Sequence, residues 1–315
     1  MTYRDQLPQS DGELFLTDGG IETVLIFKEG LDLPEFAAFD LLKDEQGTEQ
    51  LRRYYDPYLA LARERGAGFV LESPTWRANP RWAEQIGHDR ERLDGFNRKA
   101  IALLEEIRAE QEADGTPIVI SGCIGPHDDG YDPDELLSES AAQEYHSTQI
   151  ATFADTAADM VTAITMTYPE EAIGIARAAR EHGLPVAISF TVETDGRLPS
   201  GHGLGEAIAQ VDEATGGYPA YYMINCAHPT HFEHVLVGDE PWLERIQGLR
   251  ANASTLSHAE LDEAEELDDG DPEDLGARYS QLRASLPRLN VLGGCCGTDH
   301  RHLGAISAAW ERQGA

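Results

Sequence analysis

Short apolar runs alternate with longer amphipathic stretches along the whole chain, and this alternation limits the folds that the chain can adopt. Eight such runs occur in the 315 residues. They lie at residues 14–17, 69–71, 118–120, 160–161, 186–190, 222–224, weakly around Leu249, and at 290–292. Strands buried on both faces of a parallel sheet are short and almost continuously apolar, so each run predicts a strand.

The stretches between these runs predict helices. In one of them apolar residues recur every three or four positions, and Gly115 and Pro117 follow it. The recurring residues are Leu93, Phe96, Ala100, Leu103, Leu104 and Ile107. A second predicted helix runs from Ser138 to about Ala158.

Strand and helix thus alternate about eight times, with no linker rich in Gly, Ser or Pro. This order predicts parallel strands joined by right-handed crossovers and, at this length, an α/β fold with a single (β/α)8 TIM barrel over residues 1–315. A doubly wound open sheet is the alternative. It is disfavoured because no Gly-x-Gly-x-x-Gly follows the first run to form a dinucleotide site.

Two adjacent cysteines follow the last predicted strand, in Gly293-Gly294-Cys295-Cys296-Gly297-Thr298. Successive side chains of a strand point to opposite faces, so neighbouring thiols converge only where the backbone leaves strand geometry, which glycine permits. A third thiol, Cys226, follows the predicted strand at 222–224. Three thiols at two strand ends predict a zinc site with three thiolate ligands and an open fourth position.

Two other interpretations of the thiols stay open. Free cysteine is often a small buried apolar residue, and we adopt this interpretation for Cys123. It is disfavoured for Cys226, Cys295 and Cys296, because adjacent thiols between glycines pack poorly. A disulfide between neighbours would be strained, and four cysteines in 315 residues without a secretory signal favour a reducing, cytoplasmic location.

Polar residues follow other predicted strands. Asp18 follows the first strand, and Glu72, Ser73, Thr75 and Trp76 follow the second. The active sites of barrel enzymes form at the C-terminal ends of the strands, so these groups are expected at the same rim as the thiols. Taken alone, Asp18 is equally typical of a turn or helix cap, and the second group is typical of a polar loop.

Three histidines, His228, His231 and His234, follow Cys226 at intervals of three residues. Histidine is a common metal ligand. In a polar stretch, however, this spacing favours a surface helix over metal binding.

The charge balance excludes some partners. The chain has 57 Asp and Glu against 24 Lys and Arg, a formal net charge of −33, which argues against nucleic acid as a partner. The acids are spread along the chain, which is typical of adaptation to concentrated salt, and one dense segment, residues 260–273, predicts a solvated loop or helix end. No apolar stretch approaches the length of a membrane span, and the first residues, Met1 to Asp11, are polar.

Three motifs give the chain a family resemblance. Asp18-Gly19-Gly20-Ile21-Glu22-Thr23, Ile224-Asn225-Cys226 and the Gly-Gly-Cys-Cys-Gly-Thr segment at 293–298 resemble, in this order, motifs of the homocysteine S-methyltransferase family. Weaker similarities lie at Thr75-Trp76, Gly125-Pro126, Ser189-Phe190-Thr191 and Gly196-Arg197-Leu198. The resemblance spans nearly the whole chain and implies a zinc-dependent methyltransferase that makes methionine from homocysteine.

The resemblance also implies roles for residues of the site. Cys226, Cys295 and Cys296 would hold Zn²⁺, and Asp18 would pair with the substrate ammonium. The expected substrate-binding residues are Asp18, Gly19, Thr75, Trp76 and Ser189. The chemistry suits these groups, because a free thiol with a pKa near roughly 8.5 is seldom ionised at neutral pH, whereas a thiol bound to zinc is deprotonated.

One departure concerns the acceptor. The family usually has a Glu after the fourth strand, in Glu-Thr-x-Pro, whereas here residues 163–169 contain no acid. The acceptor is therefore homocysteine with one carboxylate fewer around its ammonium, or a different thiol. A zinc-binding barrel without turnover is the alternative from another class of function.

The methyl donor is open as well. The length leaves no room for cobalamin or folate domains, which favours a sulfonium or betaine-type donor, or a separate subunit that supplies the methyl group. We expect a sulfonium compound over betaine, because no motif predicts the aromatic cage that a quaternary ammonium favours. Besides these small molecules, a homo-oligomer is possible, and neither nucleic acid nor membrane is expected.

The acidity leads to a prediction about salt. Raising KCl from about 0.1 M to molar levels should raise the thermal unfolding midpoint by several degrees, because screening relieves repulsion among carboxylates in the compact state. Thermal melts across this range measure the effect. A midpoint that stays flat or falls with added salt would contradict adaptation to concentrated salt.

Overall fold

A computed structural model of the chain describes residues 3–111, 115–131, 133–264 and 266–314. In this part of the chain eight parallel strands close into a barrel in sequence order, with β1 paired to both β2 and β8. The strands are β1 (Phe15–Leu16), β2 (Gly68–Glu72), β3 (Ile118–Ile124), β4 (Met160–Met166), β5 (Val186–Phe190), β6 (Tyr221–Asn225), β7 (Ile246–Ala251) and β8 (Val291–Gly294). The (β/α)8 prediction is confirmed, and the open sheet is wrong.

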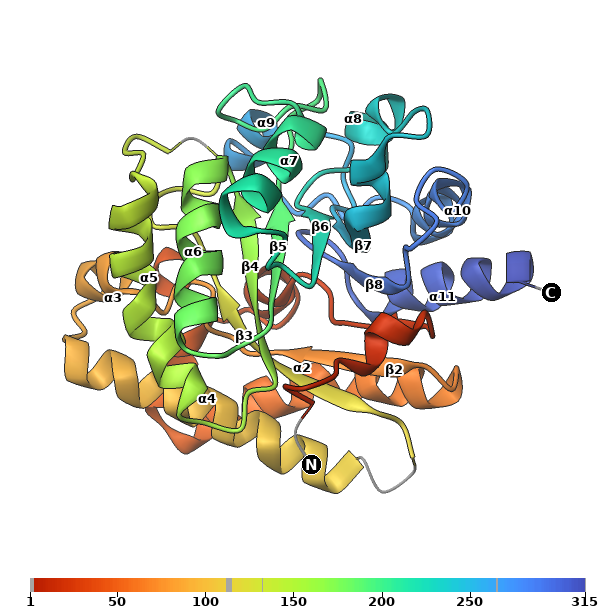
Figure 1. Ribbon diagram of the computed structural model, residues 1–315. Helices are drawn as coiled ribbons and strands as arrows, with labels where there is room; N and C mark the ends of the chain where they lie inside the picture. Colours follow the sequence, from red (N-terminus) through yellow and green to blue (C-terminus); the bar gives the residue numbers. More distant parts are fainter. Residues whose placement is uncertain (1–2, 112–114, 132, 265, 315) are drawn as a thin grey trace.

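Helices surround the barrel, as Figure 1 shows. They are α1 (Ile21–Thr23), α2 (Glu45–Glu64), α3 (Pro80–Gln85), α4 (Arg90–Gln111), α5 (Glu139–Ala154), α6 (Pro169–Glu181), α7 (Leu204–Thr215), α8 (Pro229–Phe232), α9 (His258–Asp262), α10 (Pro272–Leu282) and α11 (His300–Gly314). Among the described helices, none combines the length and apolarity needed to cross a bilayer.

The end of α5 differs from the prediction. Ser138 caps its N-terminus, with the hydroxyl accepting from the amide of Ala141, but the helix ends at Ala154 instead of near residue 158. The guanidinium of Arg4 donates to the carbonyls of Ala154 and Ala158 at 2.9 and 2.7 Å. The bond to Ala154 satisfies a carbonyl at the helix end, so a distant arginine caps this terminus.

The alternation of side chains along the strands divides the barrel interior into two levels. At the N-terminal ends the inward residues are apolar and pack under Leu7 of the N-terminal segment. They are Phe15, Val70, Val119, Met160, Ala187, Tyr221, Met223 and Val291. Two residues further along β2 and β3, the inward positions hold Glu72 and Ser121. The same register that fills the core at one end therefore presents polar groups at the other.

Candidate active site

A cavity of about 80 Å³ opens at the C-terminal ends of the strands. It is lined by residues from the ends of seven strands or the loops after them, including the three clustered cysteines. Its polar and titratable lining residues include Asp18, Glu22, Thr23, Glu72, Ser73, Cys123, Tyr131, Thr165, Cys226, Arg250, Cys295 and Cys296. We call it the inner cavity.

The three cysteines predicted as metal ligands lie together. The Sγ atoms of Cys226, Cys295 and Cys296 all lie within 4.8 Å of one another, and among the described residues this is the only such group of three or more Cys, His, Asp or Glu ligands. Cys226 and Cys295 are joined as a disulfide, with Cα atoms 5.4 Å apart, and Cys296 is a free thiol. Three convergent sulfur donors fit a soft cation such as Zn²⁺, provided that the disulfide is reduced.

Cys226 turns inward because its backbone leaves the strand. Its φ is +52° and that of Thr165, which lies opposite, is +67°. Both values are unusual for residues with a Cβ, above all for a β-branched threonine, and cost about 1 to 3 kcal/mol each. Conformations of this kind persist where neighbouring contacts enforce them.

Asn225 supplies these contacts. Its Oδ1 accepts from the amide of Thr165 at 3.0 Å and from the hydroxyl of Ser189 at 2.6 Å, and its Nδ2 donates to Thr165 Oγ1 at 2.8 Å. The Asn of the Ile-Asn-Cys motif is therefore a positioning residue that holds the end of β4 opposite Cys226.

The turn that carries Cys295 and Cys296 fits against the loop after β1. A Cβ at Gly20 would lie 2.5 Å from the carbonyl oxygen of Cys295, so only glycine allows this approach, and Gly297 has a φ of +78°. Thr298 donates to the same carbonyl at 2.7 Å, and the amide of Gly297 donates to Thr23 Oγ1 at 3.1 Å. Gly297 thus allows the departure from strand geometry that the sequence predicted, and Gly20 allows the close approach of the two loops.

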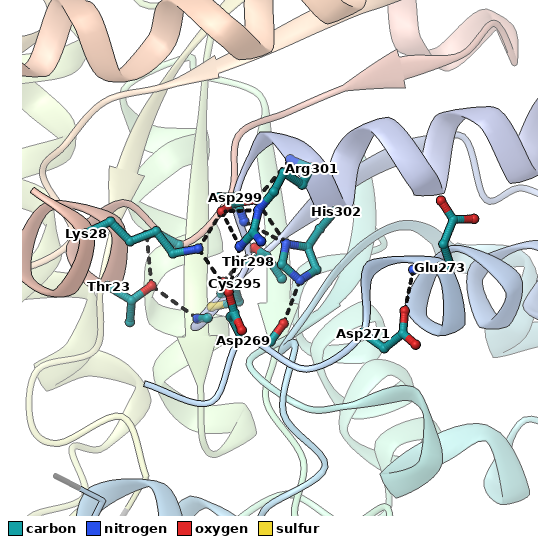
Figure 2. Close-up of polar contacts among 12 residues, drawn as sticks. Thr23, Lys28, Asp269, Asp271, Glu273, Cys295, Thr298, Asp299, Arg301 and His302 are labelled. Atoms are coloured by element: carbon teal, nitrogen blue, oxygen red, sulfur yellow. Dashed lines mark hydrogen bonds and ion pairs between the residues drawn. The ribbon is translucent and has the colours of Figure 1, made fainter. Parts of the chain in front are cut away.

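An ion-pair network fixes this turn from outside (Figure 2). Asp299 accepts from Lys28 at 2.5 Å and from Arg301 at 2.9 to 3.1 Å, and His302 lies 3.2 Å from its carboxylate. Burial would raise the pKa of Asp299, but hydrogen bonds from His302, Arg301 and Lys28 outweigh it and hold this pKa well below its usual range. The carboxylate therefore stays ionised and ties the start of α11 to the segment after α1.

Aromatic and polar side chains contact Cys296 and Cys226. The hydroxyl of Tyr131 lies 3.5 Å from Cys296 Sγ, and the Tyr131 ring stacks on His258 with centroids 4.0 Å apart. His258 Nε2 donates to the carbonyl of Cys226 at 2.6 Å, and Nδ1 faces Glu193 at 2.9 Å. Tyr131 and His258 had no signal in the sequence, because neither lies in a recognised motif: Tyr131 is in the loop after β3, and His258 is the first residue of α9.

Asp18 lines the inner cavity as predicted, but its charge is already balanced. Its carboxylate lies 2.7 Å from the guanidinium of Arg250, at the end of β7, and accepts from Tyr54 at 2.9 Å. Burial would lower the pKa of Arg250, but the carboxylates of Asp18 and Glu72 outweigh it and raise this pKa. Arg250 was hard to identify from the sequence, because its strand has the weakest apolar run.

Glu22 and Glu72 are the other carboxyl groups of the inner cavity. Burial raises the pKa of each to about 7, because the charged form loses hydration. Glu72 Oε2 is buried and has no hydrogen-bond partner among the described residues. Glu72 lies at this rim as its position after the second strand predicted, and Glu22 lies within the first of the three motifs.

The remaining predicted site residues differ in position. Gly19 and Trp76 line the inner cavity, whereas Thr75 and Ser189 are fully buried outside its lining. Thr75 donates to the carbonyl of Cys123 at 2.7 Å. Cys123 is buried, as predicted, and burial raises the pKa of its thiol well above the usual value.

The histidines after Cys226 correct one prediction in part, because only His234 is exposed as a surface helix requires. His228 and His231 are buried, not on a surface helix, because the short α8 packs against α10. His231 Nε2 donates to the carbonyl of Thr255 at 2.9 Å, and burial lowers the pKa of His228 to about 4. Within the described residues they form no metal cluster.

A second cavity, of about 370 Å³, adjoins the first and shares Glu22, Thr23, Trp76, Tyr131 and Cys296 with it. We call it the outer cavity. Five aromatic side chains line it, which the sequence did not predict: Phe27, Phe36, Trp76, Trp82 and Tyr131. One wall is part of the acidic segment 260–273, which contributes Asp262, Glu266 and Asp268, so this segment is more than a solvated loop.

The fold is similar to that of the homocysteine methyltransferase MmuM from Escherichia coli. Its oxidized form matches with a TM-score of 0.72 and 20% identity over 94% of this chain and 96% of that one. The metallated form gives 0.71 and 20% over the same shares, and the apo form 0.64 and 16% over 95% and 96%. A comparison with curated protein sequences gives no match.

The sequence model of one family, described as homocysteine S-methyltransferase, matches residues 15–310. This match covers both ends of the barrel and all three motifs that carried the resemblance. The chain therefore belongs to the homocysteine S-methyltransferase family and is a methyltransferase.

Proposed function

We propose that the protein transfers a methyl group from a sulfonium-type donor to the thiol of homocysteine, giving methionine. The catalytic domain spans residues 1–315, and Cys226, Cys295 and Cys296 hold Zn²⁺. The observation that carries the proposal is the convergence of three thiols at the mouth of a cavity lined by carboxyl groups. Bound there, zinc would keep an incoming thiol ionised at neutral pH.

The inner cavity suits the amino group of the acceptor. Asp18 and Glu72 both line it, and the free Oε2 of Glu72 offers an acceptor that Arg250 does not occupy. Glu72 on β2 thus compensates for the acid that is absent after β4. An ammonium between these carboxylates would also restore charge balance in a buried site.

Methyl transfer needs in-line approach of donor and acceptor. The acceptor sulfur forms a bond to the methyl carbon while the bond from that carbon to the donor sulfonium breaks, so one thioether forms and another leaves. The thiol proton is released to solvent when the acceptor binds. Because the two cavities meet beside Cys296, the acceptor can occupy the inner one and the donor the outer one.

A matrix of donors and acceptors tests this function. We expect methionine from homocysteine with S-methylmethionine or S-adenosylmethionine, assayed at molar KCl. Betaine was disfavoured because no motif predicts an aromatic cage. The outer cavity is lined by aromatic side chains, so betaine is included among the donors. Zinc-replete protein that methylates no thiol from any of these donors would overturn the proposal in favour of a non-catalytic or partner-dependent barrel.

Metal content gives an independent prediction. After reduction, the protein should hold about one zinc ion per chain, and Cys226→Ser, Cys295→Ser or Cys296→Ser should each lose the metal and the activity with the fold kept. Cys123→Ser is the matched control, because Cys123 lines the same cavity but lies outside the cluster. Metal analysis measures the effect, and full zinc retention in Cys295→Ser would contradict the ligand assignment.

The raised pKa of Glu72 predicts a pH dependence. Its carboxyl group is neutral below about pH 7 and ionised above it, and only the ionised form attracts an ammonium. The KM for homocysteine should therefore fall as pH rises from about 6 to 7.5, where an α-amino group stays mostly protonated. Glu72→Gln should raise this KM by about 10-fold or more at pH 7.5 and flatten the profile.

The control for this prediction is an acceptor thiol without an amino group. Its KM should be insensitive to Glu72→Gln, because no ammonium is present to lose a partner. An equal loss with both thiols would show that Glu72 supports the fold of the cavity instead of binding the amino group.

A further inference from the structure

We infer that Arg77 binds a carboxylate of the methyl donor in the outer cavity, so that the donor is an onium compound that also carries a carboxylate. The inference deepens the proposed function and rests on it. It assigns a specificity-determining residue to the donor, which neither the motifs nor the family match does.

Arg77 is a buried cation with unused hydrogen-bond donors. Its side chain is 8% exposed and lines the outer cavity, yet Nε and Nη1 have no hydrogen-bond partner among the described residues. The nearest carboxylate, that of Asp129, lies 3.9 Å from Nη2, beyond hydrogen-bond distance. Buried guanidinium groups normally use their donors, because unsatisfied ones lose hydration without compensation.

Two tryptophans hold Arg77 in place. Its Cζ lies 4.2 Å from the centroid of the Trp76 ring and 3.4 Å from that of Trp82. Stacking of this kind fixes the plane of the guanidinium and leaves its edge for hydrogen bonds. The indole Nε1 of Trp82, another lining residue, is also buried without a partner in the described part of the chain.

All three orphan atoms are donors, so the missing ligand group is an acceptor. A carboxylate matches a guanidinium edge with two parallel hydrogen bonds, and the positive charge of Arg77 favours an anion over a neutral acceptor.

The remaining lining of the outer cavity suits a cation. Six acids line it, together with the aromatic side chains: Glu22, Glu35, Asp129, Asp262, Glu266 and Asp268. A ligand that satisfies both features carries a carboxylate for Arg77 and an onium centre for the acids and rings. Sulfonium amino acids and betaines share this chemistry, whereas a simple onium alcohol such as choline lacks the carboxylate.

The position of Arg77 assigns it to the donor and not to the acceptor. Arg77 lines only the outer cavity, whereas Asp18, Glu72 and Arg250 line only the inner one. Cys296 and Trp76 line both cavities and so lie between these two sets. A carboxylate held at Arg77 therefore leaves the onium end free to face Cys296.

Binding is measured by calorimetry on reduced, zinc-loaded protein at molar KCl, without an acceptor so that no turnover occurs. The probes are S-methylmethionine against its carboxamide, and glycine betaine against choline. Each comparison keeps the onium group and removes the carboxylate. For at least one pair, wild-type protein should bind the carboxylate form about 10- to 100-fold more tightly, in line with a charge-assisted, bidentate contact.

Arg77→Gln should remove this preference, with the carboxylate form losing about 10- to 100-fold and the carboxyl-free form changing less than about twofold. Arg77→Lys keeps the charge but loses the planar fork of donors. Its affinity for the carboxylate form should therefore lie between those of wild-type protein and Arg77→Gln. Arg81→Gln is the matched control: it removes the same charge four residues away, where Arg81 pairs with Asp128 at 2.8 Å outside the cavity lining.

Wild-type protein that binds both members of each pair equally would overturn the inference, even if Arg77→Gln fails to fold. An equal loss of both members in Arg77→Gln would overturn it too, because it would indicate a structural role. A rise in the KM for homocysteine with unchanged donor binding would assign Arg77 to the acceptor and reject the donor role.

These outcomes are separable from the fate of the proposed function. Carboxylate-dependent donor binding through Arg77, with no thiol methylated, would refute the methyltransferase proposal and leave the binding inference standing. Methionine formation without a preference for carboxylate-bearing ligands would support the methyltransferase proposal and refute the inference about Arg77.

Discussion

The backbone at Cys226 is the constraint on which the mouth of the barrel depends. A residue at the end of a parallel strand would normally continue the alternation of the strand, and the thiol would then miss the two cysteines after β8. Its left-handed conformation is held by hydrogen bonds on both sides, since its carbonyl accepts from Asn252 and His258 and its amide donates to the carbonyl of Arg250. The cost of the conformation is thus met by the fold before any metal binds, which preorganises the three sulfurs.

Arg250 has the corresponding role for the charges of the site. Asp18, Glu22 and Glu72 bring three carboxyl groups into a small buried space, and without a cation they could not be ionised together. Arg250 neutralises Asp18 through a contact of 2.7 Å and leaves the other two with pKa values near neutrality. The arrangement keeps the empty cavity close to neutral while leaving carboxyl groups that can ionise when an ammonium enters.

Much of this arrangement could be predicted from the sequence, because the information is local. Apolar runs located the eight strands, Ser138 marked a helix start, and glycines beside Cys295 and Cys296 indicated a close turn. The positions that were missed depend on contacts between distant segments. Arg4 caps the end of α5 although it lies 150 residues away in the sequence, and α8 is buried because it packs against α10. Neither contact leaves a mark in the spacing of nearby residues.

The outer cavity was missed for the same reason. Its aromatic residues come from the segments after β1, β2 and β3, and no single stretch of sequence contains enough of them to indicate a cage. Arg77 was overlooked because an arginine in a loop is usually solvated, and only the structure shows it buried between Trp76 and Trp82.

The acidity of the chain and the chemistry of the outer cavity act over different distances. With a net charge of −33, an onium cation is attracted from afar in dilute solution, but at molar salt screening limits this attraction to about 3 Å. The exposed acids Asp262 and Asp268 then contribute little to the choice of ligand. Buried groups are screened far less, so in concentrated salt the discrimination among cations rests on the desolvated contacts around Arg77 and Trp76. An excess of surface acid and a selective donor site can therefore coexist. Salt screens the attraction of cations to the surface acids without weakening the contacts inside the donor site.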